Sequence, residues 1–215
     1  MLKMCIICTK AMTDVENKWD LALGIRTAGQ DETNADQYHH PYEPTPYCVL
    51  ERLADSGFFG ENDVVLDYGC GKGRVGFFLS AQTSVKSVGI EYDERICKSA
   101  LENRKAAVSG VKPDFVLTRA EAYEVPAEVN RCYFFNPFSA EILHKVMARI
   151  LDSWYERPRE IFLFFYYPDD AYIAYLMTVE ELEFYDEIPC DDLFPGDPRE
   201  RILIFQLPDY EAFGE

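Results

Sequence analysis

Apolar residues along the chain form short runs that alternate with longer segments of helical periodicity. Runs of Val, Ile, Leu and Phe bounded by polar residues predict buried, parallel strands. They lie at 64–66, 85–91, 115–117, 131–135 and 161–167. Three helices are predicted between the strands, one from Val75, one over 93–108 and one from Ser139. This alternation predicts an α/β fold with a doubly wound, mostly parallel sheet.

The apolar positions of two helices show which side faces the sheet. In the helix over 93–108 they are Ile96, Cys97, Ala100 and Leu101. In the helix from Ser139, which we expect to be its cap, they are Ile142, Leu143, Val146, Met147, Ile150 and Leu151. Both patterns indicate helices with one buried face.

The two ends of the chain follow other patterns. Two strand-like runs, 182–188 and 201–207, are separated by the turn-rich segment 189–198. The first 37 residues are polar and mixed, with a short helix predicted over 14–23. Thr45-Pro46 predicts the start of a helix, with Thr at the N-cap and Pro at the first helical position. We therefore expect a helical and loop extension or lid over 1–45 and the main domain over 46–215.

The segment from Val64 to Arg74 carries the most chemical information. Its apolar run ends in Asp67 and is followed by Gly69, Gly71 and Gly73, just before the first predicted helix. Glycine lets the backbone approach a ligand, and a helix start offers unpaired N–H groups. The pattern predicts a turn that binds an anionic or polar small molecule.

Two classes of ligand are compatible with this turn. Gly71, Gly73 and Gly76 match the G-x-G-x-x-G dinucleotide fingerprint, with Glu91 at the distance of a ribose-binding acid. That match favours an NAD(P)-binding oxidoreductase. Gly69, Gly71 and Gly73 also form G-x-G-x-G, with Asp67 two residues earlier. A carboxylate there repels a pyrophosphate and suits an ammonium or sulfonium group.

The segment also resembles the first motif of class I S-adenosylmethionine-dependent methyltransferases. Three further segments of the family follow in order: the second strand 88–93 ending near Glu91, the turn at Ala120-Glu121, and the fourth-strand motif 133–138. The resemblance covers 42–167. It implies a seven-stranded sheet with an antiparallel C-terminal hairpin, S-adenosyl-L-methionine as cofactor and S-adenosyl-L-homocysteine as product.

The resemblance also implies roles for individual residues. Asp67 and the glycines would hold the methionine and ribose, Glu91 the ribose hydroxyls, Glu121 the adenine amino group, and Tyr92 would pack on the adenine. Tyr42 and Thr45 resemble a lead-in that lines the cofactor pocket in some lysine methyltransferases of the non-SET type; the alternative is a stiff loop before a helix. The implied cofactor-binding set is Tyr42, Thr45, Asp67, Gly69, Gly71, Gly73, Glu91, Tyr92, Ala120, Glu121 and Asn136.

Asn136 and Phe138 are the candidate catalytic residues. The segment Asn136-Pro137-Phe138 is similar to the Asn-Pro-Pro-aromatic motif of amino-methyltransferases, whose Asn accepts a hydrogen bond from the target amine. This chain lacks the second proline, and its aromatic residue comes one place early. The alternative is a strand-end turn followed by a helix cap.

Charge and cysteine content limit the classes of substrate and the cellular compartment that we expect for this protein. The chain has 38 acidic and 21 basic residues, a net charge of −17, which disfavours a nucleic-acid substrate and favours a small molecule or a basic protein. Seven cysteines, an odd number, suggest free thiols in a reducing cytoplasmic compartment. Cys5 and Cys8 form one C-x-x-C pair, but with His39 and His40 they match no known zinc spacing, so no metal is expected. No apolar run is long enough to cross a membrane.

Three functions remain open at this stage. The first is methyl transfer from S-adenosylmethionine to an unidentified small molecule or protein side chain. The second is an NAD(P)-binding oxidoreductase, which would leave Asp67 and Glu121 without a role. The third is a non-catalytic S-adenosylmethionine-binding module.

Overall fold

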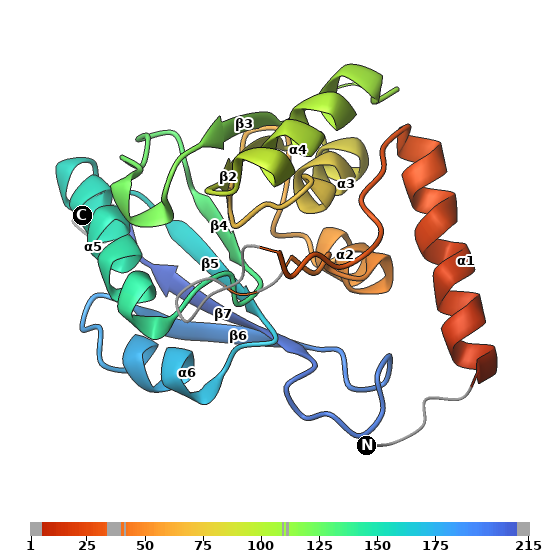
Figure 1. The fold of residues 1–215 in the computed structure, drawn as a ribbon. Helices are drawn as coiled ribbons and strands as arrows, with labels where there is room; N and C mark the ends of the chain where they lie inside the picture. The colour runs from red at the N-terminus through yellow and green to blue at the C-terminus, as the bar shows by residue number, and fades with distance from the viewer. Residues whose placement is uncertain (1–5, 34–39, 41, 109, 111, 210–215) are drawn as a thin grey trace.

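A seven-stranded sheet forms the centre of the computed structural model, which describes residues 6–33, 40, 42–108, 110 and 112–209, with only the backbone for 6–14 (Figure 1). The strands follow the order β3-β2-β1-β4-β5-β7-β6. Pairing is parallel from β3 to β5, whereas β7 runs antiparallel to both β5 and β6. The strands are β1 (Val64–Tyr68), β2 (Lys86–Glu91), β3 (Asp114–Leu117), β4 (Arg131–Phe134), β5 (Ile161–Tyr166), β6 (Glu183–Pro189) and β7 (Arg201–Leu207). The predicted sheet and its C-terminal hairpin are confirmed.

Helices cover both faces of the sheet. In Figure 1, α2, α3 and α4 lie on one side and α5 and α6 on the other, while α1 stands at the margin beside α2 and α3. The helices are α1 (Ile6–Leu23), α2 (Tyr47–Ala54), α3 (Arg74–Thr83), α4 (Glu94–Ala106), α5 (Ala140–Glu156) and α6 (Asp170–Leu176), with a 3-10 turn, η1 (Ala120–Ala122). This arrangement follows from right-handed crossovers that change side where the strand order reverses, between β1 and β4.

Two hydrophobic cores fill the space between the sheet and its helices. One joins the sheet to α5 and α6, and the other joins it to α2 and α3. All six residues of β5 are buried because the strand lies inside the sheet with helices over both faces. A ladder of stacked rings, Tyr68, Phe134 and Phe165, crosses β1, β4 and β5 at one register. The carboxyl ends of these strands are therefore held rigidly.

The N-terminal segment differs from its prediction. Helix α1 begins at Ile6 rather than at 14. Helix α2 begins at Tyr47 with Pro46 as its N-cap, so the prediction of Thr45 as the cap was wrong. The Thr45 hydroxyl instead lies 3.0 Å from the hydroxyl of Tyr133 in the core. The buried contact with Tyr133 thus takes the place of the capping hydrogen bond expected for Thr45.

Three further differences concern helices. Leu101, expected against the sheet, is 42% exposed, because the buried face of α4 consists of Ile96, Cys97, Ala100 and Asn103. Ser139 is at the N-cap of α5, but its side chain makes no capping hydrogen bond. Helix α6 was not predicted; it begins where Asp169 accepts a hydrogen bond from the backbone N–H of Tyr172.

Candidate functional site

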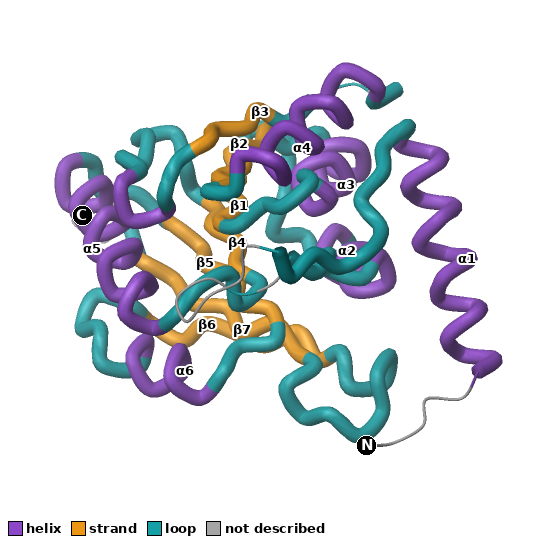
Figure 2. The backbone as a smooth tube through the Cα atoms, viewed as in Figure 1, coloured by secondary structure: helices purple, strands orange, loops and turns teal. Residues whose placement is uncertain are grey.

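A pocket opens at the carboxyl ends of β1, β2 and β4, where the strand order reverses. This is the position at which open α/β sheets bind ligands. Figure 2 shows the loop after α1 running back toward these strand ends, and this loop supplies part of the pocket wall. The predicted residues that line the pocket are Tyr42, Thr45, Asp67, Gly69, Glu91, Tyr92, Ala120, Glu121, Asn136 and Phe138.

The glycine turn adopts the backbone that its sequence predicts. Gly69, Gly71 and Gly73 all have positive φ, at 72°, 57° and 89°. A Cβ atom at Gly71 would overlap the ring of Tyr42, and one at Gly73 would overlap the ring of Phe115. Only glycine fits these two positions without moving a neighbour.

Asp67 is a buried acid in the wall of the pocket. It is 3% exposed, and its Oδ2 atom accepts no hydrogen bond from the described residues. Burial, assisted by the nearby charge of Glu91, raises the pKa of Asp67 to about 8. A cationic group in the pocket would stabilise the ionised form of this side chain.

Glu91 organises the turn around itself. Its carboxylate accepts hydrogen bonds from the backbone N–H groups of Gly71 (3.0 Å), Tyr92 (2.9 Å) and Asp93 (2.9 Å). Burial raises the pKa of Glu91, while these three bonds act in the opposite direction. Glu91 therefore ties the end of β2 to the glycine turn of β1 even without a ligand.

The loop after α1 covers the turn. The Tyr42 hydroxyl donates to the carbonyl of Thr27 at 2.5 Å, and Lys72 lies 4.7 Å from the centre of the Tyr42 ring. An isolated bridge pairs Asp31 with Tyr42, and Arg95 on α4 holds Asp31 by an ion pair. These contacts join the loop to the glycine turn and to α4 around the pocket.

The turn after β4 forms another side of the pocket. Asn136 has a φ of 38°, and its Nδ2 donates to the carbonyl of Tyr167, which also has a positive φ of 52°. The Asn136 Oδ1 atom is buried and accepts no hydrogen bond from the described residues. The Phe138 ring is 3% exposed, and its carbonyl accepts a hydrogen bond from the Tyr172 hydroxyl at 2.6 Å.

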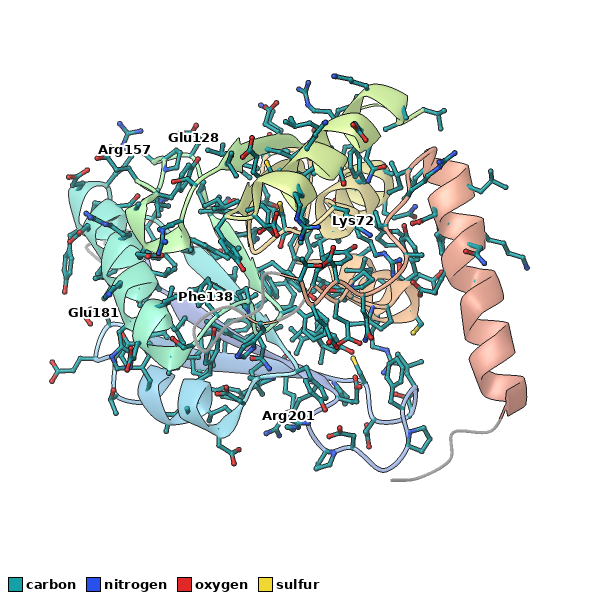
Figure 3. The ribbon with its side chains drawn as sticks, in the orientation of Figure 1. Lys72, Glu128, Phe138, Arg157, Glu181 and Arg201 are labelled. Atoms are coloured by element: carbon teal, nitrogen blue, oxygen red, sulfur yellow. The ribbon has the colours of Figure 1, made fainter. Side chains whose placement is uncertain are left out.

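Phe138 and Lys72 mark opposite sides of this region. In Figure 3, Phe138 lies inward beside α5, and Lys72 lies on the side of the loop after α1, where its ammonium donates to the carbonyl of Ala28. The sheet therefore presents its strand ends between the loop that precedes α2 and the turn that precedes α5.

The structure brings together most of the predicted residues. Asp67 near the end of β1, Glu91 at the end of β2 and Glu121 in the turn η1 after β3 line one pocket. Gly71 lies beneath Tyr42, and Gly73 faces Phe115. Their roles in binding stay predictions.

Some candidate residues lie elsewhere or were missed. At the end of β5, the hydroxyls of Tyr166 and Tyr167 donate hydrogen bonds to the carboxylates of Glu200 and Asp197, respectively. His40 lines the pocket, whereas Cys5 and His39 lie outside the described residues. Arg74, which was not singled out as a site residue from the sequence, is 2% exposed, pairs with Glu16 and lines the pocket. No sequence signal marks it, because its partners lie far away along the chain.

Neither a metal centre nor a membrane-spanning helix emerges from the described residues. Among them, no group of three or more His, Cys, Asp or Glu side chains could hold a metal ion. Within the same part of the chain, none of the helices has the length and hydropathy to cross a membrane.

Comparison with solved structures identifies the fold. The putative methyltransferase yhhF from Escherichia coli superposes with a TM-score of 0.61 at 14% identity, covering 84% of this chain and 99% of its own. A TehB-like SAM-dependent methyltransferase from Corynebacterium glutamicum gives 0.54 at 16% identity, over 94% and 99%. An RNA methyltransferase from Salinibacter ruber, solved with S-adenosyl-L-homocysteine, gives 0.53 at 19%, over 78% and 95%. The chain has the class I methyltransferase fold.

Comparison with curated sequences finds a relative that is also a methyltransferase. A protein-lysine N-methyltransferase of Saccharolobus islandicus is 36% identical over 74 residues, which is 34% of this chain. The match spans 46% of that relative, less than half its length. No family model matches the chain.

Proposed function

We propose that the protein is an S-adenosylmethionine-dependent methyltransferase. The observation that carries this proposal is the convergence of Asp67, Glu91 and Glu121 around the glycine turn, at the point where the strand order reverses. The three acids would bind the cationic end, the ribose hydroxyls and the adenine amino group of one ligand. Tyr92 and Ala120 line the same pocket and would contact the adenine.

The cofactor would supply a methyl group on a sulfonium, a leaving group that needs no activation. The protein's part is then mainly positioning and exclusion of water. Asn136 is suited to this task because its Nδ2 is fixed on Tyr167 and its Oδ1 is left as a hydrogen-bond acceptor. An acceptor amine would donate an N–H to Oδ1, which turns its lone pair toward the methyl group. Phe138 supports the turn from the core side.

As acceptor we propose an amine of a basic protein. The net charge of −17 attracts a basic partner, and a protein-lysine methyltransferase is among the relatives. Several structural neighbours are named as RNA methyltransferases, but at 14–19% identity they carry an argument about fold alone. The segment 1–45 would act as the lid, since Tyr42 from its end covers Gly71.

An NAD(P)-binding oxidoreductase is the competing proposal from sequence. Gly71, which would have to approach a pyrophosphate, lies beneath Tyr42, and the buried Asp67 offers the phosphates no compensating positive charge. A non-catalytic binding module would share the cofactor site and differ only in lacking turnover.

Calorimetry with S-adenosyl-L-homocysteine and with NADH tests these proposals. We expect binding of the first ligand only, weakened about 10- to 100-fold by Glu91→Gln, since a hydrogen bond to a charged group is lost. Glu94→Gln, an exposed neighbour at the start of α4, is the matched control and should leave affinity unchanged. Absence of binding at high micromolar concentration would remove the methyltransferase proposal. Transfer of labelled methyl to basic proteins then separates an enzyme from a binding module.

A further inference from the structure

Two residues that follow neighbouring strands share a backbone conformation that L side chains rarely adopt. Asn136 and Tyr167 have φ angles of 38° and 52°, and among the described residues other than glycine the only further positive φ is that of Ser84. Phe134 pairs with Phe165 across β4 and β5, so each of the two residues comes two positions after a paired one. Asparagine tolerates the left-handed region, whereas a bulky tyrosine is an outlier there. Such outliers persist where their surroundings hold them, and they cluster at functional sites.

A hydrogen bond joins the two residues and orients the Asn136 amide. Nδ2 of Asn136 donates to the carbonyl of Tyr167. Because a carbonyl oxygen only accepts, the amide turns its nitrogen toward Tyr167 and its oxygen away from it. That oxygen is buried, accepts no hydrogen bond from the described residues and belongs to a residue that lines the pocket. The carbonyl of Tyr167 therefore determines that Asn136 offers a hydrogen-bond acceptor and not a donor.

The segment between β6 and β7, residues 190–200, holds the side chain of Tyr167. The Tyr167 hydroxyl donates to Oδ2 of Asp197 at 2.6 Å. The Arg199 guanidinium lies 4.1 Å from the centre of the Tyr167 ring and donates to the same hydroxyl. Asp197 in turn accepts from the backbone N–H of Arg199 at 3.0 Å. These contacts fix the ring from two sides.

The backbone of Tyr167 is fixed as well. Its N–H donates at 3.0 Å to the carbonyl of Arg201, which is the first residue of β7 and is labelled in Figure 3. Its carbonyl accepts from Asn136. Ring and backbone are thus both tied down, which keeps a tyrosine in a conformation that it would otherwise leave.

We propose that Tyr167 is a positioning residue, held in its left-handed conformation by Asp197 and Arg199 so that Asn136 presents Oδ1 to the methyl acceptor. Tyr167 acts through the Asn136 amide and touches neither the cofactor nor the acceptor. An acceptor bound in this way must donate a hydrogen, as a primary or secondary amine does. The inference rests on the proposed function, and it makes the segment 190–200 part of what sets the rate of transfer.

The test compares alanine and glycine in place of Tyr167. Both variants lose the contacts with Asp197 and Arg199, but glycine adopts the left-handed backbone freely and alanine does not. We expect methyl transfer from labelled S-adenosyl-L-methionine to poly-L-lysine to be about 5- to 30-fold slower with Tyr167→Ala than with Tyr167→Gly. If the ring served only to pack the core, glycine would have no advantage over alanine, because it adds flexibility.

The Asn136 amide provides a second readout that needs no turnover. In isotope-labelled protein observed by NMR, its side-chain N–H signals should be protected from hydrogen exchange in the wild type and partly in Tyr167→Gly, and should lose this protection in Tyr167→Ala. Asn136→Asp assigns the signals by removing them. If Tyr167→Ala fails to fold, Tyr167→Phe, which loses only the hydroxyl, should slow transfer by about 2- to 10-fold and weaken the protection.

Ser84 is the matched control, because it is exposed, has a φ of 63° at the C-cap of α3 and is not among the residues that line the pocket. Ser84→Gly and Ser84→Ala should differ in thermal midpoint but not in methyl transfer or in the Asn136 signals. Equal rates and equal protection in Tyr167→Ala and Tyr167→Gly would overturn the inference.

Two further outcomes separate this inference from the proposed function. If the wild-type protein binds no S-adenosyl-L-homocysteine, the proposed function is lost and this inference with it. If it binds that ligand and methylates poly-L-lysine, but the Asn136 amide is unprotected, the function stands and only the positioning role of Tyr167 is overturned.

Discussion

Gly71 shows how a single hydrogen atom in place of a side chain shapes the site. We expect Gly71→Ala to destabilise the protein by about 3 to 5 kcal/mol, because it combines a positive φ with an overlap on the Tyr42 ring. Gly29 also has a positive φ, 92°, but has nothing within 4 Å of a Cβ. Gly29→Ala should therefore cost only the backbone strain, about 1 to 2 kcal/mol. Urea unfolding of both variants measures the difference, and equal losses would contradict the close contact.

Asp67 makes stability depend on pH. Its folded pKa of about 8 lies above that of an unfolded aspartate, so the folded state holds an extra proton between about pH 4 and pH 8. Stability is then highest below pH 4 with respect to this group and falls as pH rises, by up to about 1.4 kcal/mol per pH unit. Asp67→Asn should remove this dependence and be more stable than wild type at pH 8. Parallel stability curves of the two proteins between pH 5 and pH 8 would disprove the raised pKa.

At the scale of elements, α6 supports the turn after β4. The Tyr172 hydroxyl, fully buried, donates to the Phe138 carbonyl at 2.6 Å. Tyr172→Phe leaves that carbonyl without its donor, so we expect a loss of about 1 to 2 kcal/mol in unfolding free energy. Methyl transfer should slow while affinity for S-adenosyl-L-homocysteine stays the same if Asn136 in this turn binds the acceptor, as proposed.

Tyr175 provides the comparison on the same helix. Its ring stacks on His144, and its hydroxyl makes no hydrogen bond to the described residues. Tyr175→Phe should therefore leave both stability and turnover close to wild type. If the two substitutions behave alike, α6 has no positioning role.

Elements that are apolar on both faces were predictable from sequence, and those fixed by distant partners were not. The apolar run of β5 was recognisable as a central strand from its own sequence, because all of its residues are buried. Helix α6 has only seven residues, which is too short for a clear helical pattern. In the sequence its N-cap, Asp169, looks like any solvent-exposed acid. Thr45 follows the local capping rule in sequence, but its partner Tyr133 is 88 residues away.

The difference between local patterns and distant partners also explains which parts of the site were predicted and which were missed. Asp67 and Glu91 lie at the carboxyl ends of β1 and β2, and Glu121 lies in the turn after β3. Parallel strands bring their carboxyl ends to one edge, so local patterns were enough to predict these three residues. Arg74 forms its contacts with Glu16, Thr27 and Thr45, which lie 58, 47 and 29 residues away. No local pattern could show that its charge is buried in the pocket wall.

At the scale of the whole molecule, a net charge of −17 favours a basic partner. Attraction between a basic protein substrate and this surface is screened once the Debye length falls from about 10 Å at 0.1 M salt to roughly half that at 0.4 M. We expect the KM for a basic protein to rise at least about fivefold over that range, with kcat nearly unchanged, because screening slows encounter and not chemistry. Binding of S-adenosyl-L-homocysteine, a small zwitterion in a buried pocket, should vary little and serves as the control. A basic substrate whose KM ignores salt, or tight binding of RNA at 0.15 M salt, would show that a local patch rather than the overall charge selects the acceptor.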